Sequence, residues 1–130
     1  MRNGSEVVLD ASALLALMRA ERGADRVAAV IDGAAIGAVN LAEVVSKFVR
    51  EGIAIGVVRE WIAALDLDVR PFDQELALVA GALLPARCNR GLSLGDRACL
   101  ALAHQLGRTA LTTDSAWRDL DVGVAIDVIR

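Results

Sequence analysis

The chain has 130 residues, of which 55% are hydrophobic and 24% charged, and its formal net charge is −3 at pH 7. This length fits one domain over residues 1–130, and the apolar content excludes a disordered chain. The longest stretch without charged or polar side chains, Leu76 to Ala86, is shorter than the ~20 residues of a membrane span, and the start lacks the apolar segment of a secretory signal. We therefore expect a cytoplasmic protein that does not enter a membrane.

The hydrophobic pattern alternates strands with helices along the chain. Strands are predicted at 6–10, 34–39, 67–70, 109–112 and 124–129. Helices are predicted from 12, at 24–31, from 41 to Gly52, at 56–65, from 73 to about 84 before Pro85, at 93–105 and at 115–120, with a polar loop over 86–92. Strands separated by helices of this length favour right-handed crossovers, so we expect an α/β fold with a parallel sheet covered on both faces.

Four acidic residues fall where such a sheet binds its ligands. Asp10 ends the first predicted strand, Glu43 lies in the first helical turn after the second, and Asp114 follows the strand at 109–112. Asp96 lies in the first turn of the helix at 93–105, and its place beside the others is inferred from them, since no clear strand precedes it. Ligands of open α/β sheets bind beyond the carboxyl ends of the strands. The acids are therefore expected to gather at one edge.

Such a group of acids predicts a divalent cation. Pooled carboxylates repel unless some are protonated or a cation holds them. The chain has 2 cysteines without CxxC spacing and 1 histidine, which argues against a Cys/His zinc site and a Ser-His-Asp triad. Oxygen ligands suit Mg²⁺ or Mn²⁺, which can activate water and bind phosphodiester oxygens. Negative net charge argues against coating nucleic acid by bulk electrostatics but allows a local basic lip.

Each acid also has a purely structural explanation. Asn40 with Glu43, and Ser93 with Asp96, have the spacing of a capping box. Asp114 could cap the helix that starts at 115, and the first acid could form an Asx-type turn with the two residues after it. Acids are favoured near helix N-termini in any case, so only the convergence of the set favours chemistry.

The sequence resembles the motif series of the PIN-domain nucleases, and most of all the VapC-type toxins of bacterial toxin–antitoxin pairs. The similar segments are VVLDASALLAL at 7–17, NLAEV at 40–44, LSLGDRACLALA at 92–103 and LTTDSAW at 111–117. The resemblance runs nearly end to end. It implies a PIN-like α/β/α sandwich with a five-stranded parallel sheet, a Mg²⁺- or Mn²⁺-dependent endoribonuclease acting on RNA, a homodimer, and a cognate antitoxin lying across the active-site groove.

The resemblance also implies roles for particular residues. The family's acids fall on Asp10, Glu43, Asp96 and Asp114, the first, third and fourth as metal ligands and Glu43 holding or activating the attacking water. The hydroxyls of Ser12 and Thr112 would orient metal-bound waters or the last carboxylate. Around the loop before Asp96, three arginines either form a lip for RNA phosphates or are simply solvated, namely Arg87, Arg90 and Arg97.

Two other functions stay open at this point. An aspartyl-nucleophile phosphohydrolase or phosphotransferase would need a second acid two residues after Asp10, where this chain has Ser12. A non-catalytic receiver-like module would need a lysine near the last strand, and the single lysine is Lys47. Release of RNA fragments, of inorganic phosphate, or of neither would distinguish the three.

Overall fold

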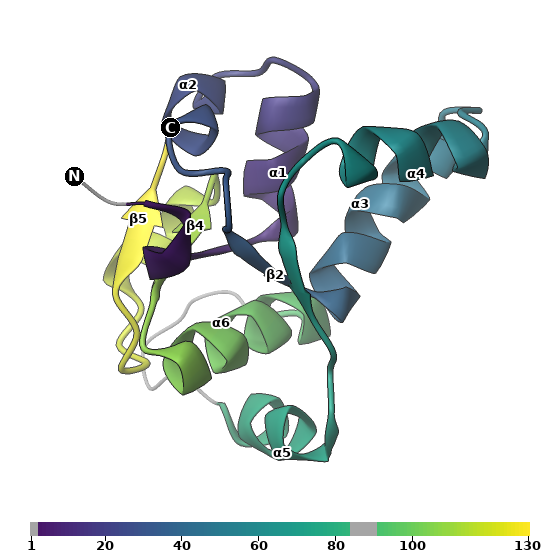
Figure 1. The fold of residues 1–130 in the computed structure, drawn as a ribbon. Coiled ribbons are helices and arrows are strands. Elements are labelled where there is room, and N and C mark those ends of the chain that lie inside the picture. Colours follow the sequence, from purple (N-terminus) through teal and green to yellow (C-terminus); the bar gives the residue numbers. More distant parts are fainter. Residues whose placement is uncertain (1–2, 84–90) are drawn as a thin grey trace.

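The computed structural model describes residues 3–83 and 91–130. It has the strands β1 (Val7–Leu9), β2 (Ala35–Gly37), β3 (Asp68–Arg70), β4 (Thr109–Thr112) and β5 (Ile126–Val128). The α-helices are α1 (Ala11–Met18), α2 (Ala24–Ala28), α3 (Ala38–Arg50), α4 (Ile55–Ala63), α5 (Gln74–Ala82) and α6 (Leu94–Leu106) (Figure 1). Two short 3₁₀ helices, η1 (Gly4–Glu6) and η2 (Ser115–Asp119), complete the elements.

The strands form one parallel sheet of 5 strands in the order β3-β2-β1-β4-β5. β1 lies at the centre, where Val8 is opposite Ala35 of β2 and Ala110 of β4. Because all pairs are parallel, every strand ends at the same edge of the sheet. The predicted α/β fold with a five-stranded parallel sheet is confirmed.

Helices cover both faces of the sheet and enclose two apolar cores (Figure 1). Alternate residues of β1 point to opposite faces: Val7 and Leu9 pack with residues of α1 to α4, whereas Val8 packs with residues of α5, α6 and η2. A strand buried on both faces reads as a continuous apolar run, which is why β1 and β2 show no polar alternation. The result is the expected α/β/α sandwich.

Local sequence signals predict most helix ends correctly. Asp73 accepts a hydrogen bond from the backbone N–H of Leu76 at 3.0 Å, as its predicted cap requires. Gly107 ends α6 with a φ of 64°, a left-handed conformation that favours glycine. The predicted strand at 124–129 is shorter, and the helices predicted at 24–31 and 56–65 end at Ala28 and Ala63. The predicted stop at Pro85 and the loop over 86–90 lie outside the described residues.

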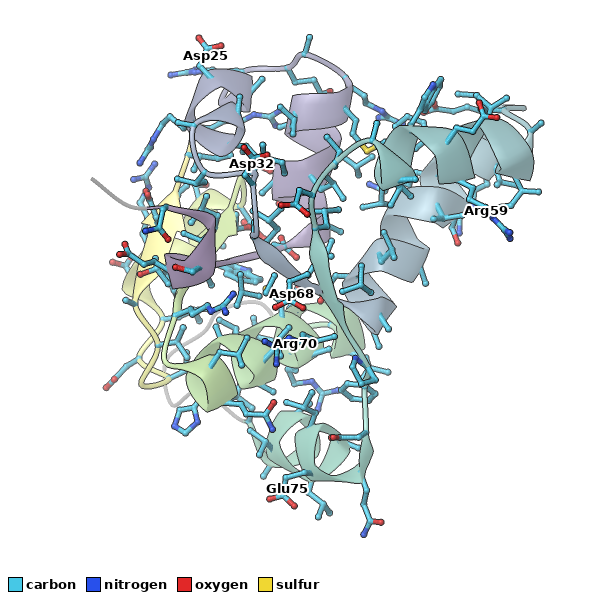
Figure 2. All side chains as sticks on the ribbon, viewed as in Figure 1. Asp25, Asp32, Arg59, Asp68, Arg70 and Glu75 are labelled. Carbon is cyan, nitrogen blue, oxygen red and sulfur yellow. The ribbon has the colours of Figure 1, made fainter. Side chains whose placement is uncertain are left out.

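The sheet edge at β3 carries an ion pair. Arg70 donates from Nε to both carboxylate oxygens of Asp68, at 3.0 and 2.9 Å, and the two side chains lie together in Figure 2. Hydrogen bonding from Arg70 lowers the pKa of the Asp68 carboxyl. Charged side chains on an edge strand discourage pairing with another chain, so we assign this pair to the edge and not to chemistry. Among the described residues, no helix is long and apolar enough to cross a bilayer.

Candidate active site

Asp10 occupies the turn between the central strand β1 and helix α1. Its backbone N–H donates to the carbonyl of Leu111 on β4 at 2.9 Å, which extends the pairing of the two strands by one residue. Although Asp10 is the N-cap residue of α1, its side chain makes no capping hydrogen bond. Only 6% of the residue is exposed. A buried carboxylate without a capping role needs other partners.

Two hydroxyl groups hold the same oxygen of this carboxylate. Ser12 Oγ donates to Asp10 Oδ2 at 2.8 Å, and Thr112 Oγ1 donates to it at 2.9 Å. The two hydroxyl oxygens lie 3.2 Å apart, but each has a single proton and uses it on Asp10. Backbone N–H groups of Thr113 and Asp114 donate in turn to Ser12 Oγ and Thr112 Oγ1, at 3.0 and 3.1 Å. The network ties β1 and α1 to the end of β4.

Burial dominates the protonation of Asp10. It raises the pKa of the carboxyl from 3.8 to about 6, against the lowering effect of the hydrogen bonds from Ser12 and Thr112. The negative charges of Asp96 and Glu43 are smaller contributions to the same rise. The same three carboxylates act on the buried thiol of Cys99, whose pKa is raised chiefly by burial. Because the carboxylates of Glu43 and Asp96 act on both Asp10 and Cys99, we infer that the three acids lie in one region, as the sequence predicts.

Asp96 has a structural role in addition to its place near Asp10. Its Oδ2 accepts from the backbone N–H of Ser93 at 3.0 Å, and its own N–H donates to Ser93 Oγ at 3.1 Å. This reciprocal capping box at the start of α6 is the one expected from the spacing. A carboxylate has two oxygens and about four acceptor sites. Capping therefore uses only part of its capacity.

Glu43 differs from its predicted surroundings. Helix α3 begins at Ala38, with Gly37 as the N-cap, so Glu43 lies in the second turn and the predicted Asn40–Glu43 capping box is wrong. Because the helix begins before it, Asn40 is a helical residue and is completely buried. Its Nδ2 donates to the carbonyl of Gly95 on α6 at 2.9 Å and to Glu43 Oε1 at 3.0 Å.

Asp114 lies just beyond β4 and caps η2. Its Oδ1 accepts from the backbone N–H of Ala116 at 2.9 Å, which confirms the expected cap, although the helix is a short 3₁₀ turn. The backbone N–H of Asp114 reaches Asp10 through Thr112 Oγ1. The fourth acid is thus joined to the first through a shared hydroxyl.

These oxygens fit a hydrated divalent cation in chemical type. Within residues 3–83 and 91–130, no three histidine, cysteine, aspartate or glutamate side chains lie close enough together to form a metal site by themselves. Mg²⁺ is commonly bound by one or two carboxylates together with waters and substrate phosphate. A buried aspartate with a raised pKa, near two further acids, is a suitable first ligand, because a cation would offset the cost of its buried charge.

Of the predicted basic lip, only Arg97 falls in the described part. It is half-buried, and its guanidinium donates to the carbonyl of Ala80 on α5 at 3.4 Å. This contact joins α6 to the end of α5. Arg87 and Arg90 lie outside the described residues.

Two residues that contact the acids escaped the sequence analysis as parts of the site. The spacing of Asn40 predicts a capping role alone, and no motif indicates Gly95. The only signal was local: a glycine directly before Asp96, inside a helix where it lowers helix propensity. Such a glycine in a helix often has a packing or functional reason.

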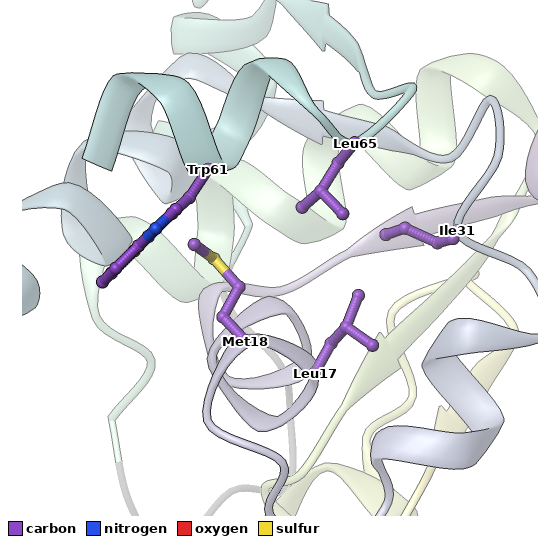
Figure 3. A pocket seen from close by; sticks show the side chains of 5 residues that line it. All are labelled: Leu17, Met18, Ile31, Trp61 and Leu65. Atoms are coloured by element: carbon purple, nitrogen blue, oxygen red, sulfur yellow. The ribbon is translucent and has the colours of Figure 1, made fainter. Parts of the chain in front are cut away.

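An apolar pocket of about 370 Å³ lies at the other end of α1 and is lined by Leu17, Met18, Ile31, Trp61 and Leu65 (Figure 3). Trp61 is 43% exposed and packs edge-to-face on Phe48, with 5.5 Å between ring centroids. Among the described residues, no titratable side chain lines the pocket. It is therefore separate from the carboxylate edge, which lies at the N-terminal end of the same helix.

Comparison with solved structures finds the same fold in toxin–antitoxin complexes. A toxin–antitoxin complex from Klebsiella pneumoniae matches with a TM-score of 0.71 and 21% identity over 92% of this chain and 95% of that chain. A VapBC2 structure from Rickettsia felis bound to promoter DNA matches with a TM-score of 0.68 and 13% identity, covering 93% and 96%. DNA-bound VapBC from Salmonella typhimurium gives a TM-score of 0.68 and 18% identity, covering 94% and 96%.

At these identities the likeness establishes the fold. A comparison with curated proteins finds no match. A family model, in contrast, matches most of the chain, from residue 7 to residue 123, and its description is the PIN domain. That span includes Asp10, Glu43, Asp96 and Asp114, and the chain therefore belongs to the PIN domain family of nucleases.

Proposed function

We propose that this protein is an endoribonuclease that hydrolyses RNA phosphodiester bonds with Mg²⁺ or Mn²⁺. One observation carries the proposal: Asp10 is buried at the carboxyl end of the central strand, held by two hydroxyls, and its pKa is raised to about 6 by burial and by the nearby charges of Asp96 and Glu43. Such a group is poised to bind a cation and is costly to keep charged without one.

The residues divide the work as follows. Asp10, Asp96 and Asp114 would hold the ion, some of them through bound waters, and the ion when bound supplies an activated water and stabilises charge on the phosphate. Ser12 and Thr112 orient Asp10 through its Oδ2, and so direct the rest of the carboxylate. Glu43 would hold the attacking water or accept its proton, the task of a general base. Arg87, Arg90 and Arg97 are candidates for contacts with RNA phosphates.

The geometry around Asp10 disfavours an aspartyl phosphotransferase. The residue two positions on is Ser12, and its hydroxyl proton is engaged by Asp10 Oδ2 at 2.8 Å. A hydroxyl in that role cannot act as the second acid of a nucleophilic aspartate pair. A receiver-like module is also disfavoured, because Lys47, the single lysine, lies in α3 and not near the last strand.

We further propose that the nuclease is the toxin of a toxin–antitoxin pair, that it forms a homodimer, and that a cognate antitoxin inhibits it. Support comes from the fold shared with toxin–antitoxin complexes over nearly the whole of both chains. Co-expression with a neighbouring small DNA-binding protein, followed by size-exclusion chromatography of the complex, tests this part.

The activity is tested with purified protein, structured and single-stranded RNA, and added Mg²⁺ or Mn²⁺. We expect RNA fragments that require the ion, no release of inorganic phosphate from phosphomonoesters, and loss of cleavage in Asp10→Asn. Release of inorganic phosphate instead of RNA fragments would establish the phosphohydrolase. Wild-type protein that cleaves no RNA with either ion would reject the nuclease.

A further inference from the structure

We infer that Asn40 and Gly95 are positioning residues that together set where the carboxylate of Glu43 stands. The inference rests on the proposed function, in which Glu43 handles the attacking water. It gives a physical reason for the buried Asn40, which has no predicted role in the site, and for the presence of Gly95 inside a helix. Asn40 pulls the carboxylate toward α6, and Gly95 leaves the space that the carboxylate fills.

Asn40 acts through its amide group. Asn40 is completely buried, and its Nδ2 donates to two acceptors: the carbonyl oxygen of Gly95 at 2.9 Å and Glu43 Oε1 at 3.0 Å. Only an NH₂ group has two protons for two acceptors, so this arrangement also fixes which way the amide points. Oδ1 has no hydrogen-bond partner among the described residues. The side chain is therefore committed to joining α3, α6 and Glu43.

Gly95 acts by lacking a side chain. A Cβ at this position would lie 2.5 Å from Glu43 Oε1 and 2.7 Å from both Cδ and Oε2. Distances below 3.0 Å cannot be kept, so something must move. The atoms in the way form the end of a flexible side chain and not backbone, so the carboxylate would shift while the fold stays intact. Gly95 thus controls the place of Glu43 without being needed for folding.

The position of this carboxylate matters because Glu43 is an exposed residue on a long side chain. Left alone it would sample several rotamers. A misplacement of about 1 Å in a reacting geometry can cost about 10²-fold in rate. Asn40 and Gly95 restrict the side chain from two directions, which is the kind of support a catalytic group needs.

The main test is Gly95→Ala, with Gly56→Ala as its matched control. Both glycines are the second residue of a helix, in α6 and α4, but a Cβ on Gly56 would meet no atom of the described residues within 4 Å. Alanine favours helix over glycine, so neither variant should melt below the wild type. We expect kcat for RNA cleavage to fall about 10²-fold in Gly95→Ala alone, with KM and the metal-induced rise in melting temperature unchanged. Equal kcat in the two variants would overturn the inference.

A double-mutant cycle shows whether Gly95 acts through Glu43. In a Glu43→Ala background the space is empty, and Gly95→Ala should cause no further loss of kcat. An added loss as large as in the wild-type background would mean that Gly95 acts elsewhere. Asn40→Leu, which keeps a similar volume but loses both donors, should also reduce kcat, and wild-type kcat in this variant would remove Asn40 from the inference.

A metal-free measurement separates this inference from the proposed function. NMR can measure how fast the Asn40 side-chain amide protons exchange with water. One of the two protons should exchange faster than in the wild type in Glu43→Ala and in Gly95→Ala, but not in Gly56→Ala. Unchanged exchange in Gly95→Ala would contradict the positioning role even in an active nuclease. If the wild type cleaves no RNA, the proposed function fails, while this readout still decides whether Asn40 and Gly95 place Glu43.

Discussion

Asp10 and Asp96 face the same region of the molecule but are held in opposite ways. Asp10 is buried, caps nothing, and depends on hydroxyls from α1 and from β4, a hundred residues away in sequence. Asp96 is half-buried and is held by Ser93, its neighbour within one helical turn. Burial shifts the pKa of Asp10 upward to about 6.

This difference distinguishes a residue whose place is explained by helix stability from one whose place is not. The hydrogen bonds of Asp96 contribute to the start of α6, so its position is explained without any function. Asp10 lies where an ionised carboxyl is expensive, and no helix needs its side chain. A fold keeps such a group when a function offsets the free-energy cost of an ionised carboxyl in a buried position. Asp10 is therefore the stronger indicator of function, whereas the position of Asp96 is explained by helix capping and needs a direct test of its role in catalysis.

The largest expected effect comes from Asp96→Asn. Asparagine keeps an oxygen that can accept from the Ser93 N–H, so the metal-free melting temperature should hold, but it removes a negative charge from the metal site. We expect RNA cleavage to slow by about 10²–10³-fold. Asp73→Asn, which changes a cap on α5 in the same way, is the control and should cleave at the wild-type rate. Wild-type cleavage by Asp96→Asn would leave Asp96 as a cap alone.

Next in size is the pH dependence of stability without metal. The folded Asp10 pKa of about 6 lies above its ordinary value of 3.8, so between these values the folded state binds more protons than the unfolded state. The free energy of unfolding should therefore fall as pH rises from about 4 to about 6, by up to roughly 3 kcal/mol. Urea unfolding in a chelating buffer measures it. Asp10→Asn should remove this component, and a profile identical to wild type would contradict the raised pKa.

A smaller change is expected from Thr112→Val. The variant keeps the shape but loses the hydroxyl that donates to Asp10 Oδ2 at 2.9 Å. That hydrogen bond favours the ionised form, so the pKa of Asp10 should rise further and the pH window of the stability loss should move upward. At neutral pH the cost is about 1.5–3 kcal/mol, as for other hydrogen bonds to charged groups. Thr109→Val, at the start of the same strand, should leave the window in place.

The smallest expected effect concerns two arginines of the loop predicted over 86–92, which lie outside the described residues. Replacing Arg87 and Arg90 with alanine should weaken RNA binding and reduce its salt dependence by about one unit of slope for each lost phosphate contact. The metal-induced rise in melting temperature should stay, since neither residue is a proposed metal ligand. An unchanged slope, measured by filter binding over a series of salt concentrations, would assign both arginines to a solvated loop.

Several features followed from the sequence because they depend on neighbouring residues. The alternation of strands and helices, the caps at Asp73 and Ser93, and the glycine end of α6 all rest on local conformational preferences. The strand at 109–112 was predicted with its observed bounds. Parallel topology then places Asp10 and Asp114 at one edge, because parallel strands end on the same side.

Tertiary structure decided what each polar side chain does at that edge. Asn40 and Glu43 have the spacing of a capping box, yet α3 begins earlier and Asn40 turns to the carbonyl of Gly95, 55 residues away. The hydroxyls of Ser12 and Thr112 meet on one oxygen of Asp10 only because β1 and β4 pair. Local spacing carries no information on which distant acceptor a buried donor will find, since that choice is made by the packing of α3 on α6 and of β1 beside β4.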